Sequence, residues 1–181
     1  MKNFAAVVFI AYMFFACTTP KTVTQTKEVV HSYETSFNRG KVLKGVLTRT
    51  DIESDTAFKW FHENMKLGRA DAAAVDAFKK HGSDIKMVIF GGTWCEDTQN
   101  LLPLFYRLAD KSGFPDSSIS LLGVDRAKTT VGNLNKAFNI LKVPTFIVMK
   151  EGKEMGRVVE YGNDEPIDKQ IGDIVIAAFK N

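Results

Sequence analysis

The order of apolar segments after residue 82 constrains the fold more than any other feature of the chain. Five of the six residues in Ile85–Phe90 are apolar, and Gly91-Gly92 ends the run, which is typical of a strand buried on both faces. The pattern then predicts a helix over 95–110, a strand over 118–124, a helix over 131–138, strands over 145–150 and 155–161, and a helix over 167–179. Parallel βαβ units followed by a hairpin and a closing helix give an α/β fold with a central mixed sheet flanked by helices.

The residues before this region predict a smaller, mostly helical extension of the same domain. Val42–Asp51 alternates loosely and predicts a first strand. Ser54 or Asp55 can cap a helix that runs to about residue 65. A second helix is expected over 71–80, with Gly82 as its stop. The predicted folded domain is therefore 42–181.

The first residues have the composition of an export signal. Lys2 is followed by a 13-residue apolar run, Phe4–Ala16, which is shorter than the roughly 20 residues of a membrane-spanning helix. Ala16 directly before Cys17 resembles a bacterial lipobox. That resemblance implies cleavage after residue 16, lipidation of Cys17 and anchoring to a membrane through its acyl chains. An ordinary cleaved signal and an uncleaved anchor remain alternatives.

The segment 17–41 begins with polar, Thr-rich sequence and predicts a flexible tether between the lipidated cysteine and the domain. A tether of this kind lets a folded domain stand off the bilayer. The expected location is the bacterial cell envelope, as a periplasm-facing lipoprotein.

Two motifs in the domain carry a resemblance to a known family. The first, Gly92-Thr93-Trp94-Cys95-Glu96-Asp97-Thr98, joins the Ile85–Phe90 strand to a helix, and the second is Val143-Pro144-Thr145-Phe146. Pro144 lies 49 positions after Cys95. The pair resembles the thioredoxin superfamily, in which Trp-Cys-x-x-Cys at a strand-to-helix turn faces a cis-proline loop. The resemblance implies a thioredoxin fold over about 84–181 and a cis bond before Pro144.

The resemblance also implies site roles. Cys95 would be the nucleophile, with Trp94 beside its sulfur. Val143 would offer backbone hydrogen bonds to an extended substrate segment, and Thr145, Glu96 and Asp97 would line the same place. The N-terminus of a helix favours the thiolate form of a cysteine, whereas neighbouring carboxylates disfavour it, and the sequence does not decide between these effects.

The chain departs from the family at two linked positions. Thr98 occupies the place of the second, resolving cysteine, and Ile89 occupies the place of a buried acid that assists that cysteine. The chemistry implied is that of a single thiol that stops at a mixed disulfide until an external thiol releases it. Thr98 has two candidate roles: its hydroxyl can hydrogen-bond the sulfur of Cys95, or Thr98 can be a first-turn residue of the helix whose hydroxyl bonds the backbone.

Two functions from different classes follow. The first is an envelope-tethered thiol–disulfide oxidoreductase that acts through Cys95 on exported proteins with cysteines or disulfides, or on a small thiol. The second is a thioredoxin-fold binding or scaffold module without redox turnover. No cofactor is expected. The three histidines, His31, His62 and His81, are scattered and predict no metal site, and a net charge of +3 without a basic cluster argues against nucleic acid as a partner.

Overall fold

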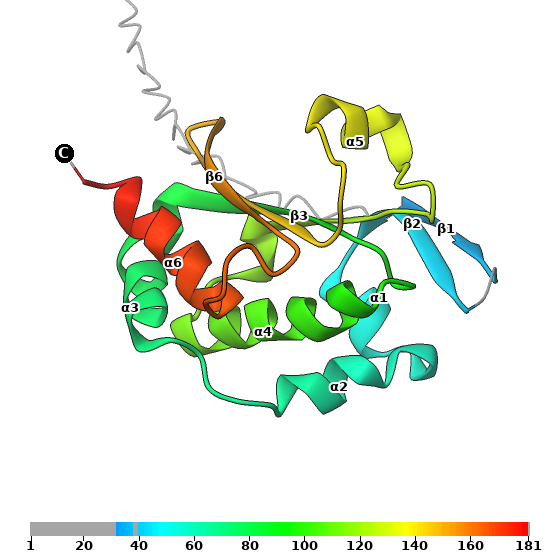
Figure 1. Ribbon diagram of the computed structural model, residues 1–181, viewed down its shortest axis with the longest axis horizontal. Coiled ribbons are helices and arrows are strands. Elements are labelled where there is room, and N and C mark those ends of the chain that lie inside the picture. Colours follow the sequence, from blue (N-terminus) through cyan, green and yellow to red (C-terminus); the bar gives the residue numbers. More distant parts are fainter. Residues whose placement is uncertain (1–31, 38–39, 181) are drawn as a thin grey trace, which may run out of the picture.

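The computed structural model describes residues 32–37 and 40–180, in which six strands form one sheet (Figure 1). The strands are β1 (Ser32–Ser36), β2 (Val42–Leu47), β3 (Ile85–Gly91), β4 (Ile119–Gly123), β5 (Thr145–Lys150) and β6 (Lys153–Val159). The helices are α1 (Arg49–Glu53), α2 (Trp60–Met65), α3 (Ala72–His81), α4 (Glu96–Ser112), α5 (Leu134–Ala137) and α6 (Ile167–Ala177). Short 3-10 turns connect several of them.

The sheet is mixed, with strand order β1-β2-β4-β3-β5-β6. β3 and β4 are parallel, joined through α4, and β5 and β6 form an antiparallel hairpin that pairs with β3. The β1–β2 hairpin joins the other side, where β2 runs antiparallel to β4. The predicted βαβ unit followed by ββα is confirmed for β3 to α6, and this is a thioredoxin fold with an N-terminal addition.

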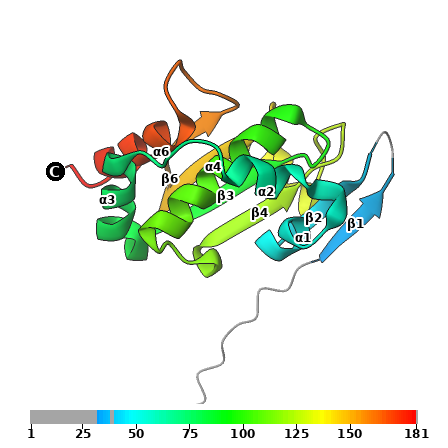
Figure 2. The ribbon, with the colours of Figure 1, turned by 90° about the horizontal axis from the view of Figure 1, so that it is seen from below.

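The helices divide unequally between the two faces of the sheet. α4, α3 and α6 cover one face, α2 lies against α4, and α5 lies beyond the opposite face (Figures 1 and 2). The larger core fills the space between the sheet and the first group of helices, around Phe105, Phe146 and Ile171. A smaller cluster on the other face contains Phe90 and Ile147 and extends to Cys95. The candidate thiol therefore borders the smaller cluster.

The predicted strand over 42–51 is too long. β2 ends at Leu47, and Thr48 then caps α1: its side chain accepts from the backbone of Asp51, whose carboxylate bonds the backbone N–H of Thr48. This reciprocal cap stops the strand. The helix predicted to run to residue 65 is also divided, because Asp55 caps a 3-10 turn over Thr56–Phe58 before α2 begins.

The tether predicted to reach residue 41 overlaps a strand that the sequence did not suggest. All five residues of β1 are exposed, so no burial pattern marks this strand, and it forms by backbone pairing with β2 from Ser32 to Ser36. The sheet therefore begins ten residues before the predicted domain boundary. Cys17 and the predicted signal over 1–16 lie outside the described residues. Within the described residues, no helix has the length and apolarity to cross a membrane.

Candidate active site around Cys95

Cys95 lies at the junction between β3 and α4 and is half-buried. It is the N-cap residue of α4, a 17-residue helix, and its side chain makes no capping hydrogen bond. Its backbone N–H donates to Gly92 O at 2.8 Å, which closes a tight turn, and its carbonyl accepts from Gln99 N at 3.0 Å. The sulfur is therefore placed where the unpaired N–H groups and dipole of a long helix favour negative charge.

The turn that carries Cys95 is attached to β2 through Thr93. The hydroxyl of Thr93 accepts from Leu43 N at 3.2 Å and donates to Lys41 O at 3.0 Å. The Thr93 carbonyl in turn accepts from the Gln99 side chain at 2.9 Å. Thr93 is buried, so these bonds form away from water and fix the turn against both β2 and α4.

Trp94 is fixed on the β4 side of the same turn. Its indole N–H donates to Val124 O at 3.0 Å, and the guanidinium of Arg126 lies 5.1 Å from the centre of its ring. A Cβ at Gly92 would lie 2.7 Å from two atoms of the indole ring, so the ring position requires glycine there. Trp94 and Cys95 border the same apolar cluster, as expected from the sequence.

The proline loop faces Cys95. The Val143–Pro144 bond is cis, as predicted, and the Cys95 thiol donates to Val143 O at 3.4 Å. Only a protonated thiol can make this last bond. The Pro144 carbonyl accepts from Glu160 N at 2.7 Å. The two motifs that were far apart in the sequence are thus brought into direct contact.

Thr145 does not line the substrate side of this loop as expected. Its side chain is 1% exposed, and its hydroxyl donates to Lys142 O at 2.7 Å. Thr145 therefore supports the loop from inside. Of the other predicted contact residues, Glu96 is exposed and Asp97 is half-buried in the first turn of α4. Asp97 reaches the loop electrostatically, because its charge adds to the stronger effect of the Glu160 hydrogen bond in raising the pKa of Lys142.

The second role considered for Thr98 is the one the structure shows. Thr98 is 1% exposed, and its hydroxyl accepts from Gly92 N at 3.2 Å. Within the described part of the chain, no hydrogen bond joins this hydroxyl to the sulfur of Cys95. Thr98 therefore braces the turn from the buried side of α4. Ile89 is fully buried in the core, and Cys95 is the one cysteine among the residues described.

An ionic network stabilises the loop that follows β4. The Asp125 carboxylate accepts from Lys44 at 2.9 Å and from the Thr129 hydroxyl and backbone at 2.5 and 2.8 Å. Burial opposes ionisation of Asp125, but the Thr129 and Lys44 hydrogen bonds outweigh it and lower its pKa to about 2. The Asp125 carboxylate thus joins β2 through Lys44, while the Arg126 guanidinium next to it in the sequence lies over the Trp94 ring.

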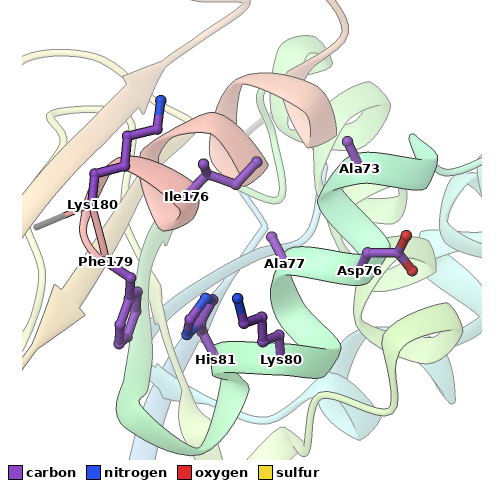
Figure 3. A pocket seen from close by; sticks show the side chains of 8 residues that line it. All are labelled: Ala73, Asp76, Ala77, Lys80, His81, Ile176, Phe179 and Lys180. Carbon is purple, nitrogen blue, oxygen red and sulfur yellow. The ribbon is translucent and has the colours of Figure 1, made fainter.

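The larger hollows of the surface lie away from Cys95. One, of about 440 Å³, is a groove between α3 and α6 in which His81 stacks on Phe179 at 3.9 Å between ring centres (Figure 3). None of its lining residues belongs to the turn or loop around the thiol. Over the residues that the structure describes, no group of three or more His, Cys, Asp or Glu side chains is placed to hold a metal ion.

Comparison with known proteins agrees with this geometry. Residues 70–173 match the family model described as thioredoxin. The chain belongs to the thioredoxin family. It is 34% identical to a thioredoxin from Staphylococcus haemolyticus over 80 residues, which is 44% of this chain and 71% of that protein. It is 30% identical to thioredoxin H2 from Arabidopsis thaliana over 95 residues, which is 52% of this chain and 66% of that relative.

Among solved structures, the germline-specific thioredoxin Deadhead from Drosophila melanogaster aligns with a TM-score of 0.39 and 17% identity, covering 56% of this chain and 87% of that chain. The matched family region includes the Cys95 turn and the Pro144 loop, and it excludes β1, β2, α1 and α2. The N-terminal hairpin that holds Thr93 therefore lies outside the part of the chain shared with the family model.

Proposed function

We propose that this thioredoxin-family protein is a monothiol thiol–disulfide oxidoreductase whose nucleophile is Cys95. The observation that carries the proposal is the placement of a half-buried thiol at the N-terminus of α4, in contact with the cis-proline loop. The family assignment supports the reaction class. The monothiol character rests on Thr98, which is buried and bonded to Gly92 in the place of a second thiol.

The proposed reaction is an exchange of disulfide partners. The Cys95 thiolate attacks one sulfur of a substrate disulfide, a bond forms between the two sulfurs, and the other substrate sulfur leaves as a thiolate. The product is a mixed disulfide between Cys95 and the substrate. An external thiolate then attacks the substrate sulfur of that bond, releases Cys95 as a thiolate and becomes disulfide-bonded to the substrate. A second external thiol reduces that disulfide, so the two electrons of each completed reduction come from two external thiols.

Further elements of the proposal concern location and partners. We place the enzyme in the bacterial cell envelope, anchored through a lipidated Cys17 and facing the periplasm. Disulfides form and persist in exported proteins, which gives this chemistry its substrates. The partners would be exported proteins with cysteines or disulfides, or a small thiol. The apolar run before Cys17 supports this location.

A second function is favoured by one contact. The Cys95 thiol donates to Val143 O, so this contact uses the sulfur as a hydrogen-bond donor rather than as a nucleophile. In that case the domain would be a binding or scaffold module that holds an extended segment beside Pro144. Redox turnover would then be absent, and the domain would still bind the extended segment after Cys95 is replaced by serine.

Covalent capture separates the two functions. A full-length Cys17→Ser chain has Cys95 as its one thiol, and we expect glutathione disulfide to convert it to a single adduct, seen by intact mass. Dithiothreitol should reverse the adduct, and a chain that also carries Cys95→Ser should form none. If the native chain forms no adduct while a urea-unfolded sample does, the oxidoreductase proposal is wrong and the binding module is favoured.

A further inference from the structure

A second site lies on the opposite part of α4 from the thiol. A cavity of about 530 Å³ is bounded by the segment Gly68–Ala70, by α3 and by α4. Four of its lining residues are cationic and one is acidic, and these are Arg69, Lys79, Arg107, Lys111 and Asp76. Arg107 follows Cys95 by 12 positions, or about 18 Å along a helix, so the cavity is distinct from the thiol site.

Arg107 is the most unusual of these residues, because its charge is buried with few partners. Its exposed fraction is 8%, and its Nη1 donates to the Leu67 carbonyl. Its Nε is buried and has no hydrogen-bond partner, and no carboxylate of the described residues lies within salt-bridge distance. A guanidinium has five N–H donors, and a buried charge with unused donors is costly unless an anion joins it.

The other three cations add unneutralised charge around Arg107. Arg69, Lys79 and Lys111 form no ion pair with any residue that the structure describes, whereas Arg49 and Lys169 each bind two carboxylates. Arg107 and Lys111 are four positions apart on α4, a spacing at which like charges share a helix face and repel. A bound anion would relieve this repulsion.

The neighbouring carboxylates do not neutralise the cavity. Asp76 is exposed on α3 and forms no ion pair with any cation that the structure describes. Asp71 is committed to capping α3 through Ala74 N at 2.8 Å. The buried Asp168 accepts from Asp71 N at 2.8 Å, which fixes the end of the connecting segment. The cavity lining therefore has three more positive than negative side chains.

We propose that this cavity binds a multiply charged phosphate-type anion, either a free phosphate compound or a phospholipid headgroup. The planar guanidinium of Arg107 can donate two parallel hydrogen bonds to the oxygens of a phosphate. Two lysines and a second arginine add more positive charge than a singly charged carboxylate ligand would need, so a multiply charged anion fits the cavity better. The oxidoreductase proposal neither requires this site nor contains it.

Titration with inorganic pyrophosphate tests the site on the full chain by calorimetry. We expect saturable binding that weakens about tenfold when Lys79→Gln and Lys111→Gln are combined, since each change removes a charge-assisted contact. Both lysines are exposed, so this pair of changes leaves the fold intact, which cannot be assumed for Arg107→Gln. The matched control combines Lys80→Gln and Lys180→Gln, which removes the same charge from the adjoining groove in Figure 3.

A second arm distinguishes the source of the phosphate. Vesicles of phosphatidylcholine with and without phosphatidic acid measure headgroup binding as the excess retained by the acidic vesicles. A headgroup site is supported if the unaltered chain binds the acidic vesicles but not pyrophosphate, and if the Lys79/Lys111 variant loses the excess vesicle binding. A site for a free phosphate compound is supported if the unaltered chain binds pyrophosphate but shows no excess on the acidic vesicles. Binding of neither, or equal weakening by the Lys80/Lys180 control, overturns the proposal.

Discussion

Replacing Thr93 with valine should loosen the turn that carries the thiol. Valine keeps the shape of threonine but loses both hydrogen bonds of the hydroxyl, which join Leu43 N at 3.2 Å and Lys41 O at 3.0 Å. Leu43 is 1% exposed, so its N–H would be left unpaired at a cost of about 1–3 kcal/mol. Lys41 is partly exposed, so its carbonyl can accept a hydrogen bond from water instead of from Thr93. Loss of this second hydrogen bond therefore adds only about 1 kcal/mol.

The expected total is a fall of about 2–4 kcal/mol in the free energy of unfolding. For a domain of this size, each kcal/mol lowers the melting temperature by about 2–4 °C, so the expected drop is roughly 4–16 °C. Urea unfolding and a thermal melt measure both. Because Thr93 lies two residues before Cys95, the rate at which a disulfide reagent labels the native thiol should change as well.

Two matched variants make this prediction specific. Thr93→Ser keeps the hydroxyl and should cost about 1 kcal/mol, for the lost methyl group. Thr130→Val removes one buried bond, to Gly123 O at 2.7 Å, and should cost about 1 kcal/mol without changing the labelling of Cys95. The reasoning is refuted if Thr93→Val is as stable as the unaltered chain, or if Thr130→Val alters Cys95 labelling equally.

Three further predictions concern the surroundings of the thiol. Thr98→Cys should restore a resolving thiol beside Cys95, so that the mixed disulfide becomes short-lived and an internal disulfide appears in the intact mass; a persistent adduct would contradict this. Gly92→Ala should shift the Trp94 indole, which a new Cβ would meet at 2.7 Å, and quenching of its fluorescence should report the shift, with an unchanged spectrum as the contrary result. Because the pKa of Asp125 is lowered to about 2 in the folded state, its carboxylate adds to the free energy of unfolding above about pH 4, and this contribution is lost as the pH falls toward 2. In Asp125→Asn, the free energy of unfolding measured against pH should lose about 1 kcal/mol of this dependence, after allowance for solvent screening.

The parts of the fold that depend on local pattern could be predicted from the sequence. Ile85–Phe90 became β3, Gly82 ends α3 as predicted, and the cis bond before Pro144 followed from the family resemblance. These features are encoded within a few residues of one another, by apolar periodicity, by caps or by a short motif.

The parts that depend on distant contacts could not be predicted. β1 has five exposed residues, so its existence is decided by pairing with β2 rather than by its own apolar pattern. The hydrogen bonds of Thr93 give no local sequence signal, because its partners lie 50 and 52 positions away. The stacking of Arg126 on Trp94 spans 32 positions and gives no local signal either.

The proximity of several residues around Cys95 could be predicted, but not all of their contacts. Cys95, Trp94 and Pro144 come together as the resemblance implied. Thr98 and Thr145 turned inward, because each threonine hydroxyl satisfies a nearby backbone group of the turn or loop that it supports. Both roles follow from the need to pair backbone groups away from water, which sequence spacing alone does not specify.

The most direct test of the account is the rate at which Cys95 reacts with 5,5′-dithiobis(2-nitrobenzoate) at pH 7, in native and in urea-unfolded full-length Cys17→Ser protein. The account predicts that the native thiol reacts at least as fast as the unfolded one, because Cys95 is only half-buried at the N-terminus of α4. A native rate more than about tenfold below the unfolded rate would show an inert, shielded thiol and would contradict the assignment of Cys95 as a nucleophile.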